Sequence, residues 1–146
     1  MKRLSIAFAF LFAVSSFSAI ANDVSVNADA LSTFQKTFAD ARSVTWSYER
    51  NLYKADFQLY DQHAIAFFNE AGDLMAAGRR LTSEQLPIFL QISLKTKSQG
   101  YAITDILEVT NEEGLYYYAT LESASKTLMI KSNSDKNWNT YKKIKK

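Results

Sequence analysis

The sequence of 146 residues has no cysteine, one histidine, one proline and four glycines. Without cysteine the protein forms no disulfide and carries no lipid-modified cysteine, and a metal would have to rely on oxygen ligands. The four glycines lie too far apart in the sequence for a glycine-rich phosphate loop. These absences predict a fold stabilised by packing alone, and no cofactor and no metal site.

The sequence also lacks the residue patterns that are typical of enzyme active sites. A nucleophile of the Ser–His type would have to use His63, which lies beside a polar turn without a G-x-S-x-G context. We interpret it as a strand-end histidine without a catalytic role. Asp105, Glu112 and Glu113 form the nearest acidic group, for which a solvated turn is the favoured interpretation. Paired carboxylates remain open, but no pair stands out, and we expect no enzyme activity.

The N-terminus has the pattern of an export signal. Lys2 and Arg3 precede an apolar run from Leu4 to Val14, and the following small residues end in Ala19-Ile20-Ala21. The run is shorter than the roughly 20 residues that span a bilayer. We therefore predict a signal peptide over residues 1–21 and a periplasmic or secreted protein, with a retained anchor as the less favoured alternative.

Signal removal changes the charge balance. The chain has 17 Lys and Arg against 15 Asp and Glu, and the loss of Lys2 and Arg3 leaves equal numbers. A neutral mature chain does not indicate nucleic-acid binding. The remaining basic charge is concentrated in the last five residues, in Lys142, Lys143, Lys145 and Lys146. These lysines could contact anionic lipid or an acidic partner, although a role in solubility is favoured.

The first half of the mature chain reads as a helix followed by strands. Leu31, Phe34, Phe38 and Ala41 share one helical face over about residues 29–41. Alternating apolar residues then predict strands at 44–48, 52–60 and 63–68, with a weaker fourth strand at 74–81. Gly72 supplies the positive φ that the turn between the last two requires.

The second half has a similar order of elements. Thr82 and Gln85 resemble a capping box before a helix that ends near Lys97, and strands are expected at 103–110, 115–122 and 126–131. The tail from Trp138 has apolar residues at three-residue spacing, which favours a short closing helix or turn. Tyr53-x-Ala55-x-Phe57 in one half matches Tyr117-x-Ala119-x-Leu121 in the other.

The predicted fold is therefore α+β in a single domain over residues 22–146. It consists of two helix-plus-three-strand repeats, at about 29–81 and 82–146, which share one antiparallel sheet. Both helices pack on one face of that sheet, and a chance match between two amphipathic strands is the alternative to duplication.

Three short segments resemble a known family. They are Phe38-x-x-Ala41-x-x-Val44-x-Trp46, then Tyr53-x-Ala55-x-Phe57, then Phe67-Phe68-Asn69-x-x-Gly72-x-Leu74. Together they resemble the PepSY-like, β-lactamase-inhibitor-like domains exported by Bacteroidetes-type bacteria. The chain departs from that pattern in having Ala39 where the family usually has proline and Ser47 where it has an acid. The resemblance implies a fold like β-lactamase inhibitor protein and a non-enzymatic envelope role, without implying β-lactamase inhibition.

The candidate interaction surface follows from strand alternation. If Tyr117 faces the core, Tyr116 and Tyr118 face the other side, where the equivalent positions in the first half include Lys54 and Asp56. Two tyrosines on an open sheet face suit recognition of an unknown protein or peptide partner in the envelope. The alternative for these tyrosines, packing under the tail against Trp138 or Tyr141, is slightly favoured. The alternative function is a carrier or sensor of a small apolar ligand, held between sheet and helices in a cavity lined by Phe34, Phe57 and Phe89.

Overall fold

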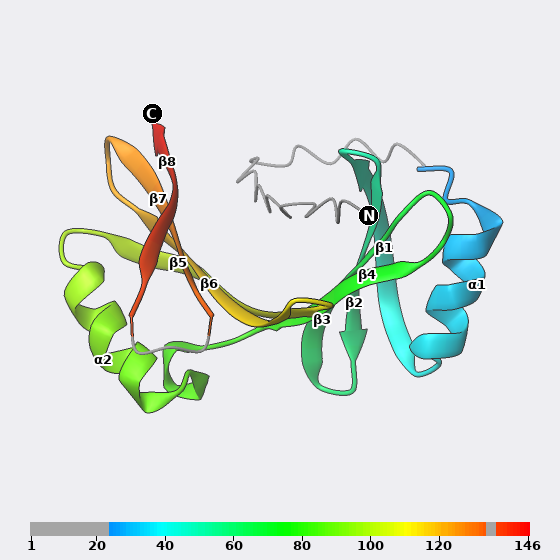
Figure 1. Ribbon diagram of the computed structural model, residues 1–146, viewed down its shortest axis with the longest axis horizontal. Coiled ribbons are helices and arrows are strands. Elements are labelled where there is room, and N and C mark those ends of the chain that lie inside the picture. Colours follow the sequence, from blue (N-terminus) through cyan, green and yellow to red (C-terminus); the bar gives the residue numbers. More distant parts are fainter. Residues whose placement is uncertain (1–23, 134–136) are drawn as a thin grey trace, which may run out of the picture.

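The computed structural model describes residues 24–133 and 137–146, so the predicted signal peptide lies outside the described residues. All eight strands form one antiparallel sheet whose spatial order is the sequence order, β1 to β8 (Figure 1). The elements are α1 (Ala28–Thr37), β1 (Ala41–Glu49), β2 (Leu52–Leu59), β3 (Gln62–Phe68), β4 (Leu74–Arg80), the 3-10 helix η1 (Ser83–Gln85), α2 (Ile88–Lys97), β5 (Ala102–Asn111), β6 (Gly114–Glu122), β7 (Lys126–Ser132) and β8 (Asn139–Lys145).

Both helices cover the same face of the sheet. Paired residues of neighbouring strands point to the same side of a sheet. Successive strand pairings form one row across the sheet, which contains Phe57, Ala64, Arg79, Glu108 and Tyr117. Phe57 packs in the α1 cluster and Tyr117 in the α2 cluster, so both clusters lie on one side. Figure 1 shows the sheet bent in its middle, with the helices outside the bend at opposite ends. We call this the outer face and the opposite one the inner face.

The first half is held by an aromatic core under α1. Asn27 caps this helix, because its Oδ1 accepts a hydrogen bond from Ala30 N at 2.7 Å. Phe34 packs against the sheet in edge-on contact with two aromatic rings. Its ring centroid lies 5.0 Å from that of Phe57 and 5.2 Å from that of Trp46. This geometry is favourable for aromatic pairs beyond the area that they bury.

The turn between β3 and β4 is closed against the start of α1. Asn27 Nδ2 donates a hydrogen bond to the carbonyl of Glu70. Gly72 has a φ of 85°, as predicted, and a Cβ at this position would lie 2.5 Å from Asp29 Cβ. The glycine is therefore required both for its conformation and for the close approach of the helix.

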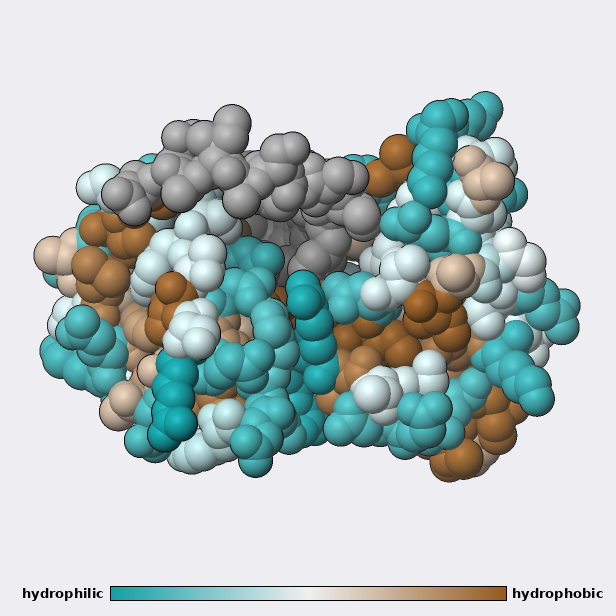
Figure 2. All heavy atoms as spheres, turned by 180° about the vertical axis from the view of Figure 1, so that it is seen from behind, coloured by the Kyte–Doolittle hydropathy of each residue, from teal (hydrophilic) through white to brown (hydrophobic). Residues whose placement is uncertain are grey.

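The second half is aliphatic under α2. The capping-box residues Thr82 and Gln85 enclose η1, and Gln85 Oε1 accepts a hydrogen bond from Thr82 N at 2.8 Å. Leu90 and Leu94 from α2 are buried, and Trp138 lies beneath them with its Nε1 donating to the Leu90 carbonyl at 3.1 Å. The other side of α2 exposes three large apolar residues, Ile88, Phe89 and Ile92. Figure 2 shows hydrophobic surface at that end of the molecule.

The halves join between β4 and β5. Gly78 is opposite Val109, and a Cβ on Gly78 would lie 2.4 Å from the Glu108 carbonyl oxygen. On the outer face, Arg79 Nε is 2.8 Å from Glu108 Oε1 across the same two strands. The pair lies between the α1 and α2 clusters, so a polar contact separates the two apolar cores.

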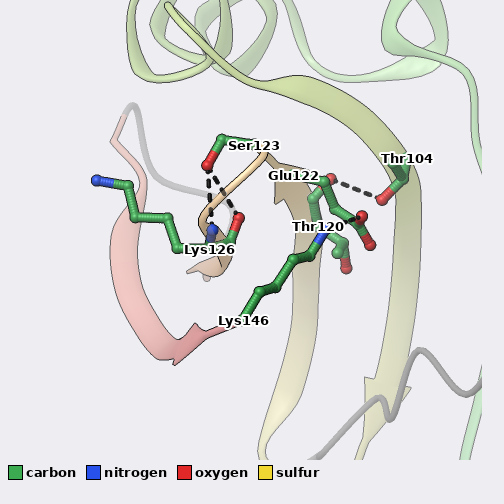
Figure 3. A network of polar contacts seen from close by, with 6 residues as sticks. All are labelled: Thr104, Thr120, Glu122, Ser123, Lys126 and Lys146. Carbon is green, nitrogen blue, oxygen red and sulfur yellow. Dashed lines mark hydrogen bonds and ion pairs between the residues drawn. The ribbon is translucent and has the colours of Figure 1, made fainter.

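The C-terminal strand is fixed at its far end by polar contacts (Figure 3). Ser123 Oγ accepts from Lys126 N and closes the turn between β6 and β7, and Lys146 Nζ lies 3.0 Å from Glu122 Oε2. Thr104 sits in the bulge of β5 and donates to the Thr120 carbonyl at 3.3 Å. One terminal lysine is thus paired within the fold.

Three expectations about the elements are wrong. Each helix is followed by four strands rather than the three of the predicted repeat: the weaker strand predicted at residues 74–81 is confirmed as β4, and the tail also forms a strand. The tail is β8, paired with β7, and is neither helix nor turn. Helix α1 ends at Thr37, and Ala41 begins β1 instead of completing the helix. Neither helix in the described residues is long and apolar enough to cross a membrane.

Candidate interaction face

The inner face carries all four predicted site residues. One transverse row on this face runs from Asp56 through Ile65, Gly78 and Val109 to Tyr116. Lys54 and Tyr118 lie on the same face in the neighbouring rows. The predicted facing of these residues therefore agrees with the strand register. They form two groups, however, because β3, β4 and β5 lie between β2 and β6.

The middle of this face is apolar. A cluster of buried side chains from β3, β4, β5 and β6 lies there, in contact with one another, and we call it the floor; its members are Ile65, Phe67, Ala76, Leu107, Val109 and Tyr118. An exposed antiparallel sheet face normally alternates polar side chains toward water. An apolar floor on the side opposite both helices is the feature that distinguishes this face.

One end of the floor is aromatic and basic. Tyr118 is 3% exposed and packs edge-on to Tyr141 of β8, with ring centroids 5.6 Å apart. Lys131 Nζ lies 3.9 Å from the centroid of the Tyr116 ring, in the range of a cation–π contact. Tyr116, Lys131, Tyr141 and three neighbouring residues line a depression of about 280 Å³. We call Tyr116, Lys131 and Tyr141 the aromatic end.

The two tyrosines predicted to share one surface therefore differ in their environment. Tyr118 packs under the last strand against Tyr141, which is the alternative that the sequence slightly favoured. Burial raises the pKa of the Tyr118 phenol above its usual value, with a smaller contribution from Tyr141. Tyr116 is only half-buried and keeps its hydroxyl near Glu113 Oε2, at 3.4 Å. Tyr116 is the tyrosine that a partner could contact without rearrangement.

The other end of the floor is polar. Asp56 Oδ1 lies 2.7 Å from His63 Nε2, and Asp56 Oδ2 lies 3.4 Å from Lys54 Nζ. Within the described ranges, the buried Nδ1 of His63 has no hydrogen-bond partner. We call Lys54, Asp56 and His63 the polar end. The sequence singled out Lys54 and Asp56 but missed their contact with His63, although the short turn between β2 and β3 places position 63 diagonally across from position 56.

A second polar pair borders the floor on β4 and β5. Arg80 Nε is 3.4 Å from Asp105 Oδ1. Burial raises the pKa of the Asp105 carboxyl above its ordinary value, and the nearby Arg80 only partly opposes this effect. Asp105 is thus part of the sheet face and not of a solvated acidic group with Glu112 and Glu113, as the sequence suggested.

The arrangement suits contact more than reaction. A histidine held by an aspartate can act as a base, but the described contacts place no serine or threonine hydroxyl on His63. In residues 24–133 and 137–146, no three histidine, aspartate or glutamate side chains cluster as a metal site would require. The face therefore combines an apolar floor with tyrosines at one end and charged side chains at the other.

The structure does not form the cavity that would favour the alternative function of a small-ligand carrier. Phe34 and Phe57 are in direct edge-on contact, which leaves no space between them. Phe89 is 54% exposed on α2, at the opposite end of the sheet from α1 (Figure 1). The three phenylalanines therefore line no common space between sheet and helices.

Comparison with solved structures places the fold. A BLIP-like protein from Bacteroides fragilis superposes with a TM-score of 0.63 at 14% identity, over 82% of this chain and 85% of that one. A DUF2874 family protein from Bacteroides uniformis gives 0.70 at 14%, over 82% and 89%. A candidate periplasmic protein from Bacteroides eggerthii gives 0.71 at 11%, over 82% and 88%. These similarities define a BLIP-like fold. No family model matches the sequence, and no curated protein does so either.

Proposed function

We propose that this protein is an exported, non-enzymatic binding module that recognises a protein or peptide through the inner face of its sheet. The observation that carries the proposal is the apolar floor on the face opposite both helices. The floor side chains are themselves at most 8% exposed, so a partner would contact the half-buried side chains at the two ends of the floor, on the side of the sheet opposite both helices.

The residues around the floor support a polypeptide partner. Tyr116 and Tyr141 offer large side chains with polar tips, and Lys131 adds a cation at the same end. Interfaces favour such aromatic residues near an apolar centre and polar groups at the rim. Lys54 and Asp56 supply those polar groups at the other end, about four strand spacings of roughly 4.8 Å away along the sheet. An extended segment of several residues would span this distance.

Two further points support export. The first residues fit a signal peptide, and one structural neighbour is a candidate periplasmic protein. The proposal includes membership of the PepSY-like family. It also includes an origin of the sheet by duplication, which the repeated order of one helix and four strands supports. The likeness to a BLIP-like protein supports the fold and does not extend to inhibition of a β-lactamase.

The test is photo-crosslinking in an envelope extract. A photoreactive phenylalanine replaces Tyr116 on the inner face or, as the matched control, Ile92 on the exposed side of α2. We expect a discrete crosslinked polypeptide from position 116, competed by unlabelled protein, and none from position 92. Unlabelled protein carrying Tyr116→Ser and Lys54→Ser should compete at least tenfold less well, because Tyr truncations at interfaces commonly cost more than about 1.4 kcal/mol. Equal competition by this variant would contradict the proposal.

A further inference from the structure

The first strand leaves one edge of the sheet unpaired in the described structure. β1 pairs only with β2, and most of its residues are exposed. Edge strands present free N–H and C=O groups, and proteins commonly protect them with lysines, prolines or a covering element. β8, at the opposite edge, carries Lys142, Lys143 and Lys145. β1 carries no lysine and no proline, and its edge is modified only by a bulge after Arg42 and by the charges of Arg42 and Glu49 near its two ends.

An apolar groove runs along the same edge. It lies between α1 and β1, has a volume of about 400 Å³, and is lined in part by Leu31, Phe34, Phe38, Val44 and Trp46. Val44 is 36% exposed and Tyr48, on the same face of β1, is 40% exposed. The edge thus combines free backbone groups with apolar side chains, which are the two requirements for adding another strand.

A bulge sets which side chains of β1 share a face. Arg42 is opposite Gln58 and Thr45 is opposite Asp56, so Ser43 and Val44 together face the single residue Phe57. Ser43 accordingly has a φ of 52°. Counting the bulge as one position leaves Arg42 and Glu49 on the inner face, and Val44, Trp46 and Tyr48 on the outer face.

We propose that β1 pairs with β1 of a second copy of this chain, antiparallel and about a twofold axis at Trp46. A twofold axis normal to the sheet keeps each side chain on its own face, so only residues of the same face can lie opposite each other. Centred on Trp46, the register sets Val44 opposite Tyr48 on the outer face and Thr45 opposite Ser47 on the inner face. It joins the two sheets into one and brings the two apolar grooves together.

Charge complementarity selects this occupant and this register. With Trp46 at the centre, Arg42 of each copy lies opposite Glu49 of the other, so two opposite-charge pairs form across the axis. Neither side chain takes part in an ion pair with any described residue of its own chain, and each is exposed. The same operation at β8 would bring lysines of two copies together, which is unfavourable.

Sedimentation equilibrium of the purified protein tests the pairing. We expect a reversible dimer that weakens with added salt, because the charge pairs are exposed. Arg42→Glu and Glu49→Arg each place like charges opposite each other twice, and each should raise the dimer dissociation constant about tenfold, equivalent to about 1.4 kcal/mol. The double variant with both changes should restore dimerisation.

Matched controls keep the result independent of folding. Lys142→Glu changes a charge on the other edge strand and should leave the dissociation constant unchanged. Circular dichroism should give the same melting temperature for all these exposed-site variants when measured on the monomer. A protein that stays monomeric up to its solubility limit would overturn the proposal. A dimer that is insensitive to the charge reversals, or one broken by Lys142→Glu, would also overturn it. None of these outcomes bears on the binding role of the inner face.

Discussion

The two halves of the molecule share an order of elements but stabilise their helices differently. α1 is capped by Asn27, closed against the turn at Gly72 and buried through Phe34 in an aromatic core. α2 follows Pro87 without a side-chain cap, rests on leucines and exposes three large apolar residues to solvent. One sheet is thus covered by a helix with a side-chain cap at one end and by a helix without one at the other.

The strands of the two halves also differ in the side chains that they carry. The inner face is polar in the first half, at Lys54 and Asp56, and aromatic in the second, at Tyr116 and Tyr118. The edge strands differ too, since β8 carries lysines and β1 does not. The two halves therefore differ in surface chemistry as well as in core packing, and substitutions at matched positions measure how far they differ.

The tryptophans give the largest contrast. Trp138 is 2% exposed under α2 and donates a hydrogen bond to Leu90, whereas Trp46 is half-buried at the free edge. Trp138→Ala should reduce the free energy of unfolding by about 4 kcal/mol, and Trp46→Ala by about 1–2 kcal/mol. Urea denaturation followed by circular dichroism measures both. Similar losses would mean that the edge is as well packed as the second core.

Substitutions at two glycines distinguish the effect of a steric clash from that of backbone strain. Gly72 and Gly100 have φ values of 85° and 79°, but only at Gly72 would a Cβ meet other atoms. Gly100→Ala should cost about 1 kcal/mol from the left-handed conformation alone. Gly72→Ala should cost about 3 kcal/mol, because α1 must also move away from the turn. Thermal melting of the two variants compares them directly, and an equal loss would show that α1 is not held tightly at its start.

The paired tyrosines test the inner face. Tyr118→Ser removes a buried ring from the floor and should destabilise the protein by about 2 kcal/mol. Tyr116→Ser, at a half-buried position, should stay within about 1 kcal/mol of the unchanged protein. Denaturant titration gives both values. A collapse of stability with Tyr116→Ser would make this residue part of the core and remove it from the proposed binding surface.

Alkaline pH should give the smallest effect. Because burial raises the pKa of Tyr118 in the folded protein, the unfolded chain loses this proton first as the pH rises past about 10. The stability that this group contributes is complete below that pH and is lost as the pH rises toward the folded-state pKa. Tyr118→Phe should flatten this decline in pH-dependent unfolding experiments. An unchanged slope would show that the phenol is not the group responsible.

Much of the fold could be predicted from local patterns. The alternation of apolar residues around Phe57 and around Tyr117 located β2 and β6, and the helical spacing of Leu31 and Phe34 located α1. The tail could not be predicted in this way. Trp138 precedes β8 and packs under α2, while pairing with β7 determines the conformation of the residues that follow. Such long-range pairing overrides a three-residue spacing.

The candidate site was only partly accessible to sequence reasoning. Strand periodicity predicts that Tyr116 and Tyr118 face away from Tyr117, and the register agrees. The burial of Tyr118 depends on Tyr141, which reaches it through a strand that the sequence did not indicate. The contact of His63 with Asp56 depends on hairpin register, which is set by the turn and cannot be deduced from alternation alone.

The consecutive order of the strands has a consequence for how the chain folds. Six of the seven strand pairings join elements linked by short connections, and their closure costs little entropy. Only the pairing of β4 with β5 must close a longer loop, which contains η1 and α2. Each half can therefore condense from neighbouring hairpins as an independent nucleus. We expect the zipping of β4 onto β5, at Gly78, to be the late step that commits the two halves to one sheet.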